Sequence, residues 1–149
     1  KKLAFLSFSS GTTGLPKAVM ISHYNVTSNV LQYNEFRKGR FIPGQSKSMA
    51  FLPFYHIFGL VVVLHAQLFA GVSLIVLPKF DLKLFLKYTA QYRDDIHCLV
   101  PPIAVLLVKS PEAAKADLSS MKDIKIGAAP LTKETMAALK ARIPNCAIG

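Results

Sequence analysis

Short apolar runs alternate with helical patterns along most of this chain. Runs of strand length stand at six places, namely residues 3–8, 18–21, 48–52, 72–77, 96–100 and 125–126. Apolar positions recur at helical spacing in five segments, which begin at Ser22, Ile57, Asp81, Pro102 and Thr132. Because the strands are apolar on both faces, this alternation predicts an α/β fold with a mainly parallel sheet and helices on both faces.

Three segments of small, polar or aromatic residues follow predicted strands: residues 9–17, 53–58 and 127–130. Ligands of parallel sheets bind at the carboxyl ends of the strands. We therefore expect these three segments to lie near one another and to form the site.

Residues 9–17 read Ser-Ser-Gly-Thr-Thr-Gly-Leu-Pro-Lys. Glycine N–H groups, four hydroxyls and a lysine in one loop suit a polyphosphate. The loop is not a Walker A loop, because only two residues separate Gly11 from Gly14 and Ala18 follows Lys17. A surface turn rich in Ser, Thr and Gly is the alternative interpretation.

The string at 9–17 resembles the signature loop of the adenylate-forming enzymes, which include acyl-CoA synthetases, adenylation domains of peptide synthetases and beetle luciferases. Three further strings agree in order: Leu-Pro-Phe-Tyr-His-Ile-Phe at 52–58, Val-Pro-Pro at 100–102 and Gly-Ala-Ala-Pro-Leu at 127–131. The similarity runs from about Leu3 to Gly149 and is greatest to the 4-coumarate:CoA ligase group.

This resemblance implies activation of an aryl or fatty carboxylic acid to an acyl-AMP, with release of pyrophosphate and transfer to CoA. It implies ATP, Mg²⁺ and CoA as cofactors, and His56 and Lys17 as catalytic residues. The implied nucleotide-binding residues are Ser9, Ser10, Gly11, Thr12, Thr13, Gly14, Lys17, Gly127, Ala128, Ala129 and Pro130. The implied acyl pocket consists of Phe54, Tyr55, His56, Phe58 and Ile126. We assign no metal ligand.

Other interpretations of these residues stay open. His56 could be a packed histidine with a satisfied N–H group, and the aromatic residues around it could belong to the core. His65 and His97 are interpreted as structural. The alternatives in function are a stand-alone adenylation domain, a luciferase-like enzyme, a non-catalytic nucleotide- or anion-binding module, and a basic protein of the membrane surface.

Three positions depart from the family pattern. Coumarate-type members usually carry tyrosine where Phe58 stands, so a preference for phenolic acids does not follow. A small polar residue usually stands at Ile126, and glycine usually follows the loop lysine, where this chain has Ala18. The family's Thr-Glu motif, ribose-binding aspartate, hinge and C-terminal catalytic lysine have no counterpart here, and Asp94 and Asp95 are interpreted as solvated.

The net charge is +10, from 18 Lys and Arg against 8 Asp and Glu. The cations are scattered apart from a group at 37–40, which lies in a predicted exposed turn, so we expect no nucleic-acid partner. Neither Cys98 nor Cys146 has a metal-ligand spacing, and Cys98 is predicted to be an inert core thiol. The apolar stretch 57–77 contains His65 and Gln67 and divides at 70–71, which favours a helix and a strand over a membrane span.

The chain is expected to be an internal piece of a larger enzyme. In this interpretation residues 1–149 are part of an N-terminal AMP-binding domain, the small C-terminal domain is absent, and the chain is inactive alone. The cytoplasm or peroxisome is the expected location.

Overall fold

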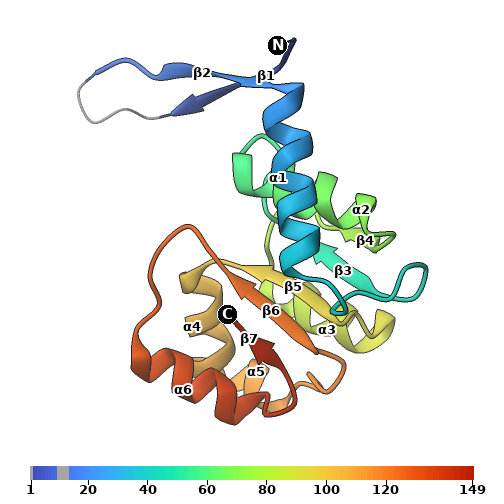
Figure 1. Cartoon of the computed structure of the whole chain (residues 1–149). Helices are drawn as coiled ribbons and strands as arrows, with labels where there is room; N and C mark the ends of the chain where they lie inside the picture. Colours follow the sequence, from blue (N-terminus) through green and yellow to red (C-terminus); the bar gives the residue numbers. More distant parts are fainter. Residues whose placement is uncertain (1, 10–13) are drawn as a thin grey trace.

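The protein is described by a computed structural model that covers residues 2–9 and 14–149. Its centre is a five-stranded parallel sheet in the order β4-β3-β5-β6-β7 (Figure 1). The strands are β3 (Lys47–Ala50), β4 (Ser73–Val76), β5 (Ile96–Leu99), β6 (Asp123–Ile126) and β7 (Ala147–Ile148). The predicted parallel sheet is confirmed.

Helices pack on both faces of this sheet. One face packs against α3 (Leu82–Tyr92), α4 (Pro101–Lys109) and α6 (Lys133–Arg142), and Phe85, Leu107 and Leu139 of these helices are fully buried in the main core. On the other face, Ala50 and Cys98 are buried against Val63. Two short helices are α2 (Gln67–Phe69) and α5 (Pro111–Lys115).

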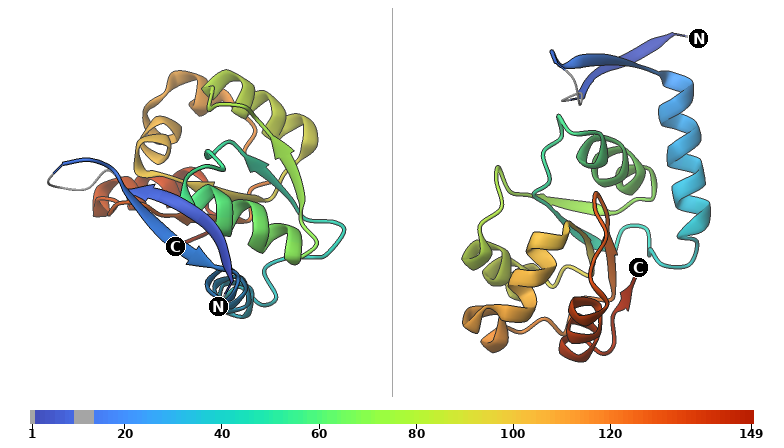
Figure 2. Two further views of the ribbon diagram at one scale, coloured as in Figure 1. Left: turned by 90° about the horizontal axis from the view of Figure 1, so that it is seen from above. Right: turned by 90° about the vertical axis from the view of Figure 1, so that its left-hand side faces the viewer.

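The first two strands do not belong to the parallel sheet, and this corrects the prediction. β1 (Leu3–Ser9) and β2 (Lys17–Ser22) form a separate antiparallel hairpin, with Ser9 opposite Lys17. The connection at residues 10–16 is too short for a parallel crossover, which needs a dozen residues or more. The hairpin projects from the rest of the chain, and α1 (His23–Phe36) joins it to the sheet (Figure 2).

The predicted helix starts are confirmed. The Ser22 hydroxyl accepts a hydrogen bond from the Asn25 N–H group, and the Asn25 side chain accepts one from the Ser22 N–H group, which completes a capping box. The side chains of Asp81 and Thr132 cap α3 and α6 by accepting hydrogen bonds from the N–H groups of Leu84 and Thr135. These polar side chains stabilise the free N–H groups of each first turn.

The predicted helix at 57–69 is largely a π-helix, η1 (Phe58–Ala66), that continues as α2. Its valines at 61–63 lower the preference for an α-helix. His65 Nδ1 lies 2.7 Å from the Leu60 carbonyl oxygen, and its ring packs edge-on against Phe5 of the hairpin. π-helical segments occur frequently at functional sites. No helix in the described part of the chain is long and apolar enough to cross a membrane.

Arg37 and Asp94, which were predicted to be exposed, are buried instead, and Asp95 is half-buried. Arg37 forms a buried ion pair with Asp123 at the start of β6. Asp94 is fully buried with its carboxylate 2.7 Å from His97 Nε2, and the Asp95 carboxylate accepts the Lys47 N–H group at 2.7 Å. The partners of Arg37 and Asp95 lie far away in the sequence, so local sequence pattern could not reveal these two contacts.

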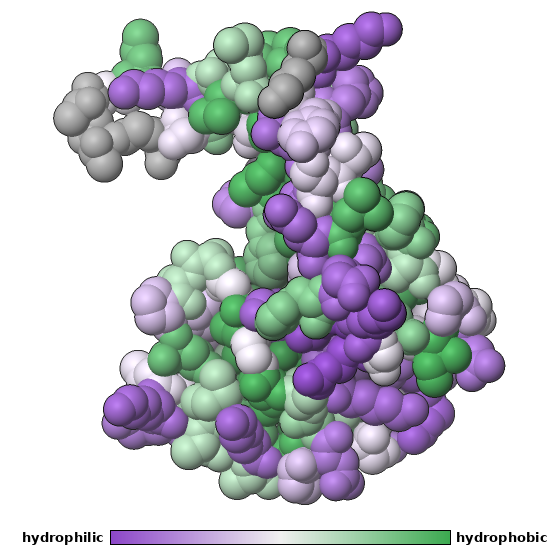
Figure 3. Space-filling model, viewed as in Figure 1, coloured by the Kyte–Doolittle hydropathy of each residue, from purple (hydrophilic) through white to green (hydrophobic). Residues whose placement is uncertain are grey.

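The surface of the hairpin is partly apolar. Leu6, Phe8 and Met20 are more than half exposed, and hydrophobic atoms are visible on the hairpin in Figure 3. This apolar surface continues into the cavities described below.

Both cysteines are expected to be unreactive in the folded protein. Burial raises the pKa of Cys98 and that of Cys146 to about 11, from an ordinary value of 9.0. Thiol labelling at pH 8 should be slow for the native chain and fast in denaturant. Because the folded chain holds these protons more tightly than the unfolded chain, the thiols lower the free energy of unfolding as the pH rises from 9 toward 11, and they have no such effect below pH 9. Prompt labelling of both thiols in the native chain would contradict the structure.

Candidate functional site

Two adjoining cavities lie between the hairpin, α1 and the segment that follows β3. Their volumes are about 850 Å³ and about 560 Å³, and both are lined by Val19, Ile21, His56 and Ile57. Ser9 and Tyr55 also line the smaller cavity, whereas Phe58 and Ala128 also line the larger one. Residues from all three predicted segments therefore meet around two connected spaces.

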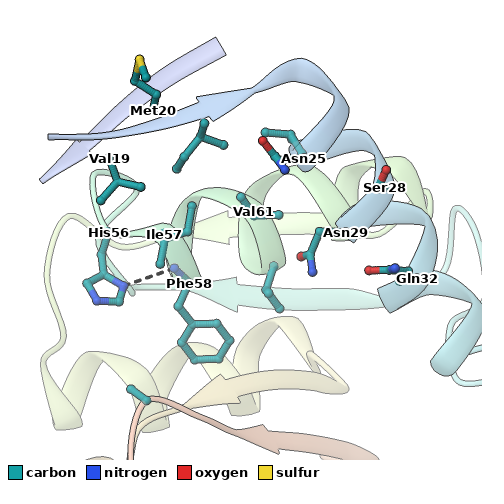
Figure 4. A pocket seen from close by; sticks show the side chains of 14 residues that line it. Val19, Met20, Asn25, Ser28, Asn29, Gln32, His56, Ile57, Phe58 and Val61 are labelled. Atoms are coloured by element: carbon teal, nitrogen blue, oxygen red, sulfur yellow. Dashed lines mark hydrogen bonds between the residues drawn. The ribbon is translucent and has the colours of Figure 1, made fainter. Parts of the chain in front are cut away.

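His56 stands where the two cavities join, just after β3. Its Nδ1 atom accepts a hydrogen bond from the Phe58 N–H group at 3.2 Å (Figure 4). In a neutral ring this places the proton on Nε2. His56 can therefore donate a hydrogen bond through Nε2 to an oxygen of a bound ligand.

Gly59 holds this segment in place, and the sequence reasoning missed it. A Cβ atom at Gly59 would lie 2.8 Å from the Pro53 carbonyl carbon and 3.0 Å from the Leu52 oxygen. The same Pro53 carbonyl accepts the His56 N–H group at 3.0 Å. Only glycine allows η1 to approach this turn so closely. The isolated glycine within an apolar run was the signal that could have identified it.

Phe58 and Ala128 line the larger cavity. A Cβ atom at Gly127 would lie 3.1 Å from the Phe58 ring, so the ring packs directly on the Gly127 backbone. Ala128 has a φ of 72°, a left-handed conformation that costs about 1–2 kcal/mol for alanine. The two segments follow β3 and β6, so both lie at the carboxyl end of the sheet, as predicted.

The predicted phosphate loop is the connection between β1 and β2. Gly14 has a φ of 144°, a conformation that side-chain-bearing residues rarely adopt. Lys17 begins β2 and is exposed, and it lines neither cavity. Four predicted phosphate-binding residues lie outside the described residues: Ser10, Gly11, Thr12 and Thr13.

Two of the predicted pocket residues pack elsewhere. Phe54 packs against the cluster of Ala50, Val63 and Cys98, and Ile126 packs against the main core on the opposite face of the sheet. Tyr55 is 87% exposed, and Ala129 and Pro130 are exposed as well.

The described residues offer no cluster that fits Mg²⁺. Within 2–9 and 14–149, no three His, Cys, Asp or Glu side chains gather in a group that could hold a metal ion. We therefore assign no step to a metal through these side chains.

The family model described as AMP-binding enzyme matches residues 1–149 of this chain. The chain belongs to the AMP-binding enzymes. Curated relatives include 4-coumarate–CoA ligase 1 of Petroselinum crispum, 41% identical over 97% of this chain and 27% of the relative. A probable 4-coumarate–CoA ligase 1 of Dictyostelium discoideum is 40% identical over 95% of this chain and 26% of the relative.

Solved structures of adenylate-forming enzymes share the fold of this AMP-binding chain. A red-emitting luciferase from Phrixothrix hirtus matches with a TM-score of 0.86 and 34% identity, over 95% of this chain and 27% of its own. ATP-bound MatB from Rhodopseudomonas palustris matches with a TM-score of 0.85 and 34% identity, over 99% and 29%. The chain thus spans about a quarter of the length of the curated relatives it matches. The roles of the individual site residues stay predictions.

Proposed function

We propose that the protein that carries this chain activates a carboxylic acid with ATP and transfers the acyl group to CoA. A carboxylate oxygen attacks the α-phosphorus of ATP, the bond to the β-phosphate breaks, and pyrophosphate leaves. The CoA sulfur then attacks the acyl carbon, its proton passes to solvent, and AMP leaves. The observation that carries this proposal is the meeting of Ser9, His56 and Ala128 around adjoining cavities in a member of the AMP-binding family.

The roles in this proposal follow from position. The loop at 9–17 and Lys17 bind the β- and γ-phosphates and stabilise the charge that moves onto the leaving pyrophosphate. His56 donates from Nε2 to the acyl carboxylate or the α-phosphate, since its Nδ1 atom is already bonded to the Phe58 N–H group. The backbone at 127–130 offers a surface without bulky side chains for the adenine ring. Mg²⁺, when bound with ATP, would offset phosphate charge.

Lys17→Ala should slow adenylation more than it weakens binding of the acid, because Lys17 is assigned to phosphate. The loss of one charge-assisted contact is worth about 1.5–3 kcal/mol, or roughly ten- to a hundredfold in rate. Carboxylate-dependent exchange of pyrophosphate into ATP measures this step. Lys109→Ala, an exposed lysine at the end of α4, is the matched control. Unchanged exchange in Lys17→Ala would remove the loop assignment. ATP binding by the wild type without exchange in the presence of any acid would favour a non-catalytic binding module.

A further inference from the structure

The larger cavity is enclosed by two elements that are distant in the sequence (Figure 4). Residues between 25 and 32 of α1 line one side of it, and His56 and the first turn of η1 line the other side. The spacing between α1 and η1 therefore sets the width of the cavity. An acid that binds there meets both elements at once.

Next to the cavity, α1 and η1 are in direct apolar contact. Val26 and Val30 of α1 form one buried cluster with Val61 and Ala66 of η1, and each of the four is at most 7% exposed. The hydrophobic effect is non-directional, so this cluster holds the two elements together without fixing how far one slides along the other. A directional bond is needed to fix their spacing.

Asn34 supplies a directional bond between the two elements. Its Nδ2 atom donates to the Val30 carbonyl oxygen of its own helix at 2.9 Å and to the Ala66 carbonyl oxygen of η1 at 3.0 Å. Both N–H groups of the amide thus have an acceptor. Asn34 is half-buried and is not among the residues that line either cavity. Its influence on a bound acid must therefore pass through α1 and η1.

On the basis of the proposed function, we infer that Asn34 is a positioning residue, which fixes the spacing of α1 and η1 and thereby limits the bulk of the acid. A hydrogen bond weakens steeply with misalignment, so the bond from Asn34 resists movement of Ala66 away from α1. Without this bond, α1 keeps only its apolar contact with η1, and the cavity widens more readily around a bulky acid. Discrimination between slender and bulky acids then decreases.

The test uses pairs of acids with equal carbon number, one straight-chain and one branched, on the protein that carries this chain. Carboxylate-dependent pyrophosphate exchange gives kcat/KM for each acid. Asn34→Leu retains most of the side-chain volume and removes both donors. It should raise the ratio of branched to straight-chain kcat/KM by about three- to tenfold, as expected for the loss of one hydrogen bond. The change should arise chiefly from a lower KM for the branched acid.

Two further variants separate the bond to η1 from bonds within α1. Asn34→Ser retains a hydroxyl that can donate to the Val30 carbonyl, four residues earlier, but is too short to reach Ala66. It should change the ratio as Asn34→Leu does, and it provides the same test if the leucine variant does not fold. Thr27→Val removes a hydroxyl that donates to the His23 carbonyl of the same helix, and it should leave the ratio unchanged.

Calorimetric binding of the same acids separates this inference from the proposed function. No exchange with any acid, together with a binding selectivity that Asn34→Leu reduces, would remove adenylation and retain the positioning role. A lower thermal midpoint of Asn34→Leu with an unchanged ratio in both assays would show that Asn34 only stabilises the fold, and this would overturn the inference. A change of equal size in Thr27→Val would overturn it as well.

Discussion

Gly59→Ala should lower the free energy of unfolding by about 3 kcal/mol or more, since the new methyl group meets backbone rather than a movable side chain. Its nearest neighbours would be the carbonyl groups of Pro53 and Leu52, at distances that Cβ atoms do not show in folded proteins. Either η1 or the turn at 53–56 must move. The thermal or denaturant midpoint measures the loss.

Gly39→Ala is the matched comparison for this prediction. Gly39 has a φ of 77°, but a Cβ atom there would meet nothing within 4 Å. This variant should therefore cost only the left-handed backbone strain, about 1–2 kcal/mol. Gly59→Ala thus measures the cost of steric overlap, and Gly39→Ala measures the cost of backbone strain. Equal midpoints for both variants would show that η1 does not approach the turn so closely in solution.

A functional consequence follows from the same contact. The Pro53 carbonyl that the added methyl group would displace accepts the His56 N–H group. A Gly59→Ala protein that still folds at low temperature should therefore hold His56 less well and should exchange pyrophosphate more slowly than the wild type at that temperature. If Gly59→Ala is less stable but fully active, the turn at 53–56 shifts while His56 keeps its position.

Local signals predicted much of the fold. Ser22, Asp81 and Thr132 cap their helices because a cap needs only a side-chain oxygen and the next turn of backbone. The apolar runs located the strands to within a few residues. The prediction that β1 belongs to the parallel sheet was wrong. An apolar strand has the same sequence pattern in a hairpin and in a parallel sheet, and only the pairing of β1 with β2 distinguishes the two.

The site was predictable in part for a related reason. His56 and Ala128 could be placed at the carboxyl ends of β3 and β6 once the sheet was expected to be parallel. Gly59 could not be placed in this way. An isolated glycine within an apolar run indicates a close approach, but the backbone that it approaches is the turn at 53–56, and only the folded structure shows that contact.

Asp123→Ala is the second substitution for which we expect a large loss of stability. Its carboxylate pairs with Arg37, and the two side chains are only 4% and 6% exposed. Burial also lowers the pKa of Arg37, which reflects the cost of removing this guanidinium from water. Asp123→Ala leaves the cation buried without its partner and should cost about 3–5 kcal/mol. Arg40→Ala, which removes a half-exposed cation 4.0 Å from the same carboxylate, should cost at most about 1 kcal/mol.

A double variant distinguishes a lost partner from lost packing at this ion pair. Arg37→Met with Asp123→Leu removes both charges and retains volume, so it should be more stable than Asp123→Ala alone. Arg37 is the C-cap of α1, a helix that lines the larger cavity, and Asp123 begins β6, the strand that leads to Ala128. Asp123→Ala should therefore also raise the KM for the acid, because the ion pair connects α1 to the strand before Ala128, and both line the cavity. If the double variant is as unstable as Asp123→Ala, packing rather than charge neutralisation holds α1 on the sheet.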